Sequence, residues 1–318
     1  MRNKERENTT HIRRTAGDRV FETAVILLFV LFTFICIFPF YYLLINTISD
    51  NDLVTSGRVN FFPMLKDASG GAVPGVQFNN YLALRNVQDL GSSIIVTVAR
   101  TVIATALMVV TSAWAGYLVT KQKMWKRSFW YRFLVVTMYF NAGLVPWYMN
   151  MLMMGLTDNF LAYIIPSMVW PYNIILVKTY IESIPSSLEE SAVIDGAGTV
   201  KVWIRIILPL SIPILATIAI FGAVGNWNSF QDSLLLMNNR PDLYTLQHRL
   251  YIYLNSSSNL GAMMSQGGTV SEQAAASMLN QRVIQYTVSM VSIIPILLVY
   301  PFMQRYFVKG IMLGAVKG

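Results

Sequence analysis

Long apolar stretches separated by polar segments set the pattern of this chain. Six of the stretches approach the roughly 20 residues that an α-helix needs to cross a bilayer. They cover residues 21–45, 92–119, 133–153, 159–180, 208–236 and 283–307. The pattern therefore predicts an all-α membrane protein with six transmembrane helices.

Two of the predicted helices carry residues that suggest their surroundings. The second is rich in small residues such as Ala104 and Gly116, which let helices approach closely in lipid, so we expect it inside the bundle. The fourth contains Pro166 and Pro171, which leave backbone carbonyls free for a neighbour, water or solute. We therefore expect the fourth helix to line a pathway.

The polar segments divide the chain into a basic tail at 1–20, a six-helix membrane domain at 21–307 and a second tail at 308–318. Within the domain, long polar segments lie at 46–91, 182–209 and 238–282. The first apolar run is too long for the core of a signal peptide. We expect it to remain as a helix.

Composition and charge agree with a membrane location. Hydrophobic residues make up 54% of the chain and charged residues only 13%, about half the usual share in a soluble domain. The net charge of +8 does not indicate nucleic-acid binding, because the basic residues are not gathered with stacking aromatics. With the N-terminus inside, 17 Lys and Arg residues flank the inner segments and six the outer ones. The positive-inside rule then predicts that both termini are cytoplasmic.

One basic residue, Arg100, lies within the second predicted helix. A charge inside the membrane is a functional hypothesis by default. The alternative, which we favour, is that Arg100 snorkels to the nearby outer surface or pairs with a polar neighbour.

The sequence contains no recognisable set of catalytic groups and no phosphate-binding glycine loop. Its single cysteine, Cys36, cannot form an intrachain disulfide or a cysteine-based metal set. We therefore expect a chain that is no enzyme and holds no cofactor or metal.

The polar segment between the fourth and fifth predicted helices carries a specific pattern. Glu190, Ser191 and Ala192 are followed by three residues ending at Asp195, then by Gly196, then by nine residues. Ile206, Ile207, Leu208 and Pro209 complete it. Gly196 can take the left-handed conformation that ends a helix sharply, so we expect a short helix before it and a second helix after it.

This pattern resembles the cytoplasmic coupling loop of binding-protein-dependent ABC importer permeases, Glu-Ala-Ala, three residues, Gly, nine residues, Ile-x-Leu-Pro. The only departure is Ser191, which stands where alanine is usual. The resemblance implies a type I ABC importer permease fold in the cytoplasmic membrane of a bacterium. It also implies that the loop transmits the closure of ATPase subunits to the membrane helices, and that ATP and Mg²⁺ bind to those partners. The residues it assigns to this coupling are Glu190, Ser191, Ala192, Asp195, Gly196, Ile206, Leu208 and Pro209.

Two further segments are similar to the sugar-importing branch, in particular to the second membrane subunit of maltose-type importers. They are 227–230, Trp-Asn-Ser-Phe, and 314–318, which is similar to a tail that reaches the ATPase dimer and ends in Lys317 and Gly318. Residues 307–314 look most like permeases for complex-polysaccharide oligosaccharides, such as alginate or pectin fragments. The implied partners are a second homologous permease, two ATP-binding cassette subunits, an extracytoplasmic solute-binding protein and an oligosaccharide. We expect the binding protein to meet the outer loop 238–282.

Sugars are commonly held by aromatic faces together with a few amide or hydroxyl groups. Residues of these types in the predicted helices are Tyr139, Asn141, Trp170, Tyr172, Asn173, Trp227 and Asn228. The alternative for each is interfacial or interhelical packing, the usual place of Trp and Tyr in membranes.

Three other functions remain open at this point. An ABC permease for a non-sugar solute would carry the same coupling loop. A secondary transporter driven by an ion gradient would need intramembrane carboxylates, for which Asp232 is the strongest candidate. A membrane-bound enzyme is disfavoured by the lack of catalytic residue sets.

Overall fold

A computed structural model describes residues 16–84, 89–265 and 282–301 of the chain. It divides into two compact units, Met1–Gln77 and Phe78–Gly318.

The first unit consists of a long helix followed by a short helix and a β-hairpin. Helix α1, Ala16–Thr47, contains Pro39 and exposes nearly all its apolar side chains, as a helix surrounded by lipid or by another chain would. Helix α2 is Asn51–Thr55, and strands β1, Met64–Lys66, and β2, Ala72–Pro74, form an antiparallel hairpin. The predicted loop 46–91 is therefore ordered through most of its length.

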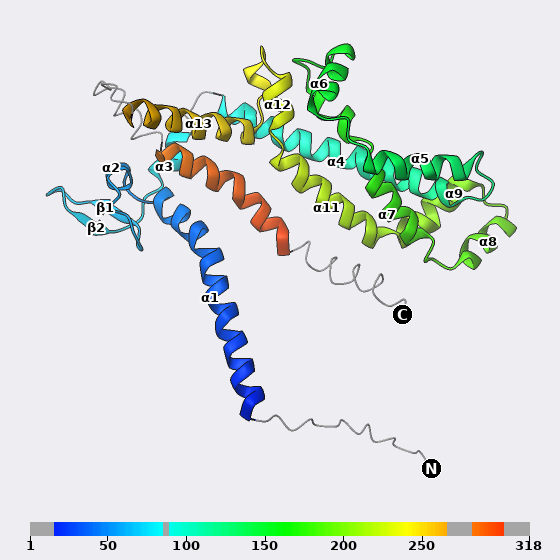
Figure 1. Cartoon of the computed structure of the whole chain (residues 1–318), viewed down its shortest axis with the longest axis horizontal. Coiled ribbons are helices and arrows are strands. Elements are labelled where there is room, and N and C mark those ends of the chain that lie inside the picture. Colours follow the sequence, from blue (N-terminus) through cyan, green and yellow to red (C-terminus); the bar gives the residue numbers. More distant parts are fainter. Residues whose placement is uncertain (1–15, 85–88, 266–281, 302–318) are drawn as a thin grey trace. The chain divides into compact units, whose positions relative to one another are not determined.

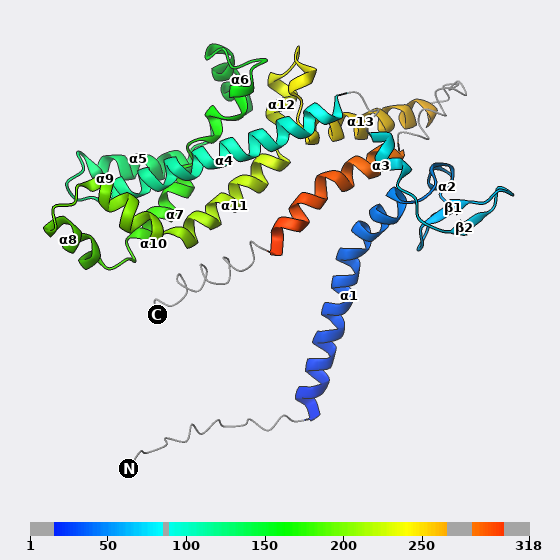
Figure 2. The ribbon, with the colours of Figure 1, turned by 180° about the vertical axis from the view of Figure 1, so that it is seen from behind.

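The second unit is built around helix α4, Leu90–Thr120, which packs against α11, Ile212–Asn228, and α7, Pro171–Ile181. Figures 1 and 2 both show α11 and α7 lying along α4. This confirms that the second predicted helix lies inside a bundle.

Small residues make the close packing around α4 possible. A Cβ atom on Gly116 of α4 would lie 2.9 Å from Val177 Cγ1 and 3.2 Å from the carbonyl oxygen of Ile174, both on α7. A Cβ atom on Gly222 of α11 would lie 2.4 Å from Met108 Cε on α4. The three helices approach one another where glycine leaves room.

Three of the six predicted crossings are long apolar helices in the structure, and two more are matched only if each of two bent helix pairs forms one span. Helices α1, α4 and Arg282–Pro301 are long and apolar enough to span a bilayer. Two bent pairs could each be one broken span: Phe160–Ser167 with Pro171–Ile181, bent by 42°, and Thr199–Leu210 with Ile212–Asn228, bent by 77°. The first bend lies between Pro166 and Pro171, the two prolines of the fourth predicted helix.

The third predicted crossing, 133–153, is not one continuous helix. Helix α5, Arg127–Tyr139, ends at Phe140, whose backbone is extended, and α6, Leu144–Met153, begins after Gly143 at φ +87°. The side chain of Asn141 caps this break, because its Oδ1 accepts a hydrogen bond from the Gly143 amide at 2.9 Å. The apolar pattern continues through the break, so hydrophobicity alone could not predict it.

The remaining elements lie at the two ends of α4 (Figure 1). Near its N-terminal end lie α3, Asn79–Ala83, α12, Gln231–Leu236, η5, Pro241–Leu243, and α13, Leu246–Ser265. Near its C-terminal end lie α8, Ser186–Ile194, and α9, Thr199–Val202. Much of the predicted outer loop 238–282 is thus helical.

Candidate functional site: a surface elbow and a polar cavity

The segment 182–209 forms an elbow of two short helices. At the end of α8, the Gly196 amide donates to the Val193 carbonyl at 3.0 Å and the Ala197 amide to the Ala192 carbonyl at 2.9 Å. Together with φ +78° at Gly196, these two bonds form a Schellman motif. Helix α9 then continues through the π-helical turn Trp203–Ile207 into α10, Leu208–Leu210. The predicted helix, glycine stop and second helix are confirmed.

The elbow is fixed to α4 by charge and by apolar packing. Glu189 of α8 forms an ion pair with Lys121, the residue after α4, and the Lys121 ammonium lies 4.0 Å from the centre of the Tyr117 ring. Beneath the elbow, Ala192 and Ala197 pack on the apolar core shared by α4, α7 and α9. The elbow is therefore tied to the helices that carry the cavity described below.

The outer surface of the elbow exposes apolar side chains beside polar ones. Leu188 is 44% exposed, Val193 55% and Ile194 85%, and Glu190 is exposed next to them. Contiguous exposed apolar side chains rimmed by polar ones are typical of protein interaction sites.

A polar cavity of about 330 Å³ lies between α4, α6, η3 (Ile165–Ser167), α7 and α11. Its wall holds two indoles, several amide and hydroxyl groups and two charged residues. The lining residues are Arg100, Met108, Trp147, Pro166, Ser167, Trp170, Asn173, Phe221, Gly222, Gly225, Asn226, Ser229 and Asp232. Among the described residues, no three His, Cys, Asp or Glu side chains are grouped so that they could hold a metal ion.

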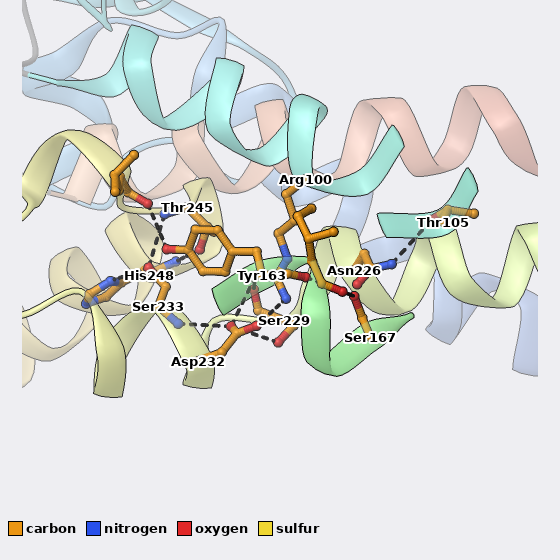
Figure 3. A network of polar contacts seen from close by, with 12 residues as sticks. Arg100, Thr105, Tyr163, Ser167, Asn226, Ser229, Asp232, Ser233, Thr245 and His248 are labelled. Atoms are coloured by element: carbon orange, nitrogen blue, oxygen red, sulfur yellow. Dashed lines mark hydrogen bonds and ion pairs between the residues drawn. The ribbon is translucent and has the colours of Figure 1, made fainter. Parts of the chain in front are cut away.

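The two charged residues of the cavity are paired with each other. Arg100 NH1 donates to Asp232 Oδ1 at 3.1 Å and NH2 to Oδ2, and NH1 also donates to the Ser229 carbonyl at 3.2 Å. The guanidinium carbon lies 4.7 Å from the centre of the Tyr163 ring. Figure 3 shows Asp232 also bound to Ser229 and to the Ser233 amide. The predicted pairing of Arg100 with a polar neighbour is confirmed.

A chain of buried polar contacts continues from this ion pair to α13 (Figure 3). Ser233 Oγ lies 2.9 Å from His248 Nδ1, and the Thr245 amide donates to Ser233 Oγ at 3.3 Å. Burial lowers the pKa of His248 to about 4, and the charge of Arg249 acts in the same direction. His248 is therefore neutral at pH 7, and its imidazole takes part in this network through hydrogen bonds and not through charge.

Similar proteins identify the family. No family model matches the sequence. The chain is 31% identical over 301 residues to the polygalacturonan/rhamnogalacturonan transport system permease protein YtcP of Bacillus subtilis strain 168, which covers 95% of this chain and 99% of that protein. It is 31% identical over 307 residues to Protein LplC of the same organism, covering 96% and 98%. The chain belongs to the ABC transporter permease family.

A solved structure agrees with this assignment. A chain in the crystal structure of a bacterial ABC transporter, involved in the import of the acidic polysaccharide alginate, is 28% identical to this permease. The two superpose with a TM-score of 0.77, over 92% of the permease and 98% of that chain. The resemblance inferred from the coupling pattern and the sugar-branch segments is confirmed. The permease is a multi-pass membrane protein, and the secondary-transporter alternative finds no support.

Most of the predicted coupling residues meet in the elbow. Glu190, Ser191 and Asp195 are exposed on it, and Gly196 forms its turn. Ile206 and Leu208 are partly buried against the core below, while Pro209 is exposed. Lys317 and Gly318 lie outside the described residues.

The predicted sugar contacts separate into two groups. Trp170 and Asn173 line the cavity. Tyr139 is 80% exposed on α5, Asn141 caps the α5–α6 break, and Trp227 donates to the Ser292 carbonyl at 3.0 Å. The other two, Tyr172 and Asn228, are exposed and do not line the cavity.

Several cavity residues were not predicted as contacts. They include Trp147, Ser167, Asn226, Ser229 and Asp232. From the sequence, Asp232 is a candidate ion-coupling carboxylate, but nothing in the residues around it indicates that it pairs with Arg100. The pairing depends on the break between α11 and α12 at Ser229 and Phe230, which hydropathy does not mark.

Proposed function

We propose that this permease is one membrane subunit of a binding-protein-dependent importer that carries oligosaccharides into a bacterial cell by alternating access. Its partners are a second homologous permease, two ATP-binding cassette subunits and an extracytoplasmic binding protein. ATP and Mg²⁺ bind to the cassette subunits, and both termini of the permease are cytoplasmic.

The observation that carries the proposal is the Glu190–Pro209 pattern folded into a rigid elbow. The elbow offers exposed apolar side chains outward and is tied to α4 through the Glu189–Lys121 ion pair. A force on α8 would reach α4 and α7 without bending the elbow, because the Schellman turn and the apolar core beneath it hold the two helices together. This geometry suits the transfer of a rigid-body movement from an ATPase.

Names of similar proteins support oligosaccharides as the cargo. The relatives include a polygalacturonan/rhamnogalacturonan permease and, in a solved structure, a transporter of alginate. The cavity contains the indoles and amides that commonly bind sugars. Fragments of complex polysaccharides are therefore the substrate class that we propose.

The test is ATP hydrolysis by the full importer, purified with its partners and reconstituted in proteoliposomes with its binding protein. Oligosaccharides from pectin and alginate should each be offered, with amino acids and short peptides as the comparison. We expect at least one oligosaccharide to stimulate hydrolysis and to accumulate inside. Stimulation by peptides or amino acids alone would contradict the proposal.

A further inference from the structure

The polar cavity carries no net charge. Among the described residues that line it, Arg100 and Asp232 are the only charged ones, and two hydrogen bonds join them. Arg100 is 2% exposed, so water screens this pair poorly. A ligand in the cavity therefore meets a closed ion pair, not a free cation.

This pairing decides which part of an oligosaccharide the cavity can hold. A carboxylate entering it would lose its hydration and approach the carboxylate of Asp232, while the guanidinium that could compensate is already neutralised. Sugar hydroxyls have no such cost. They can donate to the side-chain oxygens of Asn173, Asn226 and Ser167, which lie in the cavity wall. Each of these side chains already donates one hydrogen bond within the protein.

The wall also offers apolar surface suited to a sugar ring. Trp170 is 52% exposed and lines the cavity together with Trp147 and Phe221. Ring faces of pyranoses pack on aromatic side chains, and neighbouring polar groups fix the orientation. The cavity of about 330 Å³ is at the small end of ligand pockets, which suits one or two sugar units and not a long chain. The Nε of Arg100 is buried and has no hydrogen-bond partner among the described residues, so one N–H donor of the guanidinium is not used within the described structure.

We propose that this cavity is a subsite for an uncharged unit of the transported oligosaccharide, and that the Arg100–Asp232 pair makes it select against a uronate. The inference rests on the proposed function, because it assumes an oligosaccharide cargo. It adds that this subunit holds part of the cargo itself and that Asp232 acts as a specificity residue by cancelling the charge of Arg100.

The test compares two probes that share one sugar chain and differ mainly in charge, tetragalacturonate and its methyl ester. Their binding to the purified full complex is measured by calorimetric titration without the binding protein, so that only the membrane subunits select. We expect the wild-type complex to bind the ester roughly tenfold more tightly than the free acid, because the acid must bury a carboxylate for which the paired guanidinium of Arg100 offers no free counter-charge. Stimulation of ATP hydrolysis by loaded binding protein, measured in parallel, tests the transport function independently.

Charge variants show whether the ion pair sets the preference. Asp232→Asn leaves the guanidinium uncompensated and should reverse the preference toward the acid, whereas Arg100→Gln should strengthen the preference for the ester. The double variant Arg100→Gln with Asp232→Asn removes both charges and should restore the wild-type ratio. If one single variant fails to assemble, the other still tests whether the ratio changes, and the double variant, which buries no unpaired charge, serves as the control for assembly.

Aromatic variants show whether binding occurs in this cavity. Trp170→Ala should weaken both probes by about the same factor, and Trp130→Ala, on α5 and outside the cavity lining, should weaken neither. The inference is overturned if neither probe binds the wild-type complex, if Trp170→Ala has no effect, or if the ratio is the same in all the charge variants. Sugar-stimulated ATP hydrolysis in the same preparation would then leave the proposed function standing without the subsite.

Discussion

The guanidinium of Arg100 on α4 and the carboxylate of Asp232 on α12 form a two-point ion pair across 132 positions of the sequence. The pair joins the central helix of the bundle to the short helix that precedes η5 and α13. Tyr163, whose ring lies against the guanidinium, donates its hydroxyl hydrogen to the Leu243 carbonyl at 2.7 Å. One buried contact thus links the cavity to the helical segment of α12, η5 and α13 beside it.

Removing one partner of this pair should destabilise the permease. Arg100→Leu leaves the carboxylate of Asp232, whose side chain is only 16% exposed, without its counter-charge, and such a loss typically costs about 3–5 kcal/mol. We expect a clearly lower Tm of the purified complex. The double variant Arg100→Leu with Asp232→Leu should recover most of that loss. An unchanged Tm for Arg100→Leu would show that the pair is not formed in the membrane.

Replacing Gly196 should be costly because of its backbone conformation and not because an added side chain would lack room. A Cβ atom would meet nothing within 4 Å at either Gly196 or Gly198, but φ is +78° at the first and −71° at the second. Gly196→Ala should therefore cost about 1–2 kcal/mol, and Gly198→Ala close to nothing.

The consequence for coupling can be measured as sugar transported per ATP hydrolysed. We expect Gly196→Val to lower this ratio several-fold while the complex still assembles, because the elbow loses its fixed angle. Gly198→Ala serves as the matched control with an unchanged ratio. Normal transport by Gly196→Val would contradict the role of the elbow.

Packing between α4 and α7 should be more sensitive to an added methyl group than packing between α4 and α11. At Gly116 the new Cβ atom would press on a backbone carbonyl and on the branched side chain of Val177. At Gly222 it would meet the end of Met108, a flexible side chain that can move away. We expect Gly116→Ala to cost about 1–3 kcal/mol and Gly222→Ala less, as measured by thermal unfolding. The reverse order would show that the helices approach differently.

A buried neutral histidine should make the permease less stable in acid. The pKa of His248 falls to about 4 from its usual 6.5, so between these values the unfolded chain binds a proton that the folded chain excludes. The contribution of neutral His248 to the free energy of unfolding is fully present above pH 6.5. It is lost as the pH falls toward 4, and the total loss is about 3 kcal/mol. Between pH 7 and pH 4, the Tm should fall more steeply with decreasing pH for the wild type than for His248→Gln. Parallel curves would show that His248 does not contribute.

The family and the main helices could be predicted from the sequence, because each depends on a pattern within one continuous segment. Hydrophobic length predicted α1, α4 and the last helix, and the spacing from Glu190 to Pro209 predicted the elbow. The break at Asn141 and Gly143 was not predictable in this way, because it depends on one side chain that caps the chain inside an apolar stretch. The cavity was only partly predictable, since its ion pair joins residues from distant segments and residue type alone could not separate Trp170 from Trp227.

Two neighbouring glutamates on α8 should have different roles. Glu189 turns toward α4 and pairs with Lys121, whereas Glu190 is exposed on the outer surface of the elbow. Glu189→Gln should therefore lower the free energy of unfolding of the isolated membrane subunits by at most about 1 kcal/mol, because the pair is partly exposed, and this should appear as a small decrease in their Tm. Glu190→Gln should leave that Tm unchanged and weaken the binding of the ATPase subunits to the membrane subunits, measured by co-purification at increasing salt. Lys121→Gln provides the control, since it should reproduce the effect of Glu189→Gln and not that of Glu190→Gln. An equal loss of ATPase binding in both glutamate variants would mean that the outward surface of α8 is not the contact.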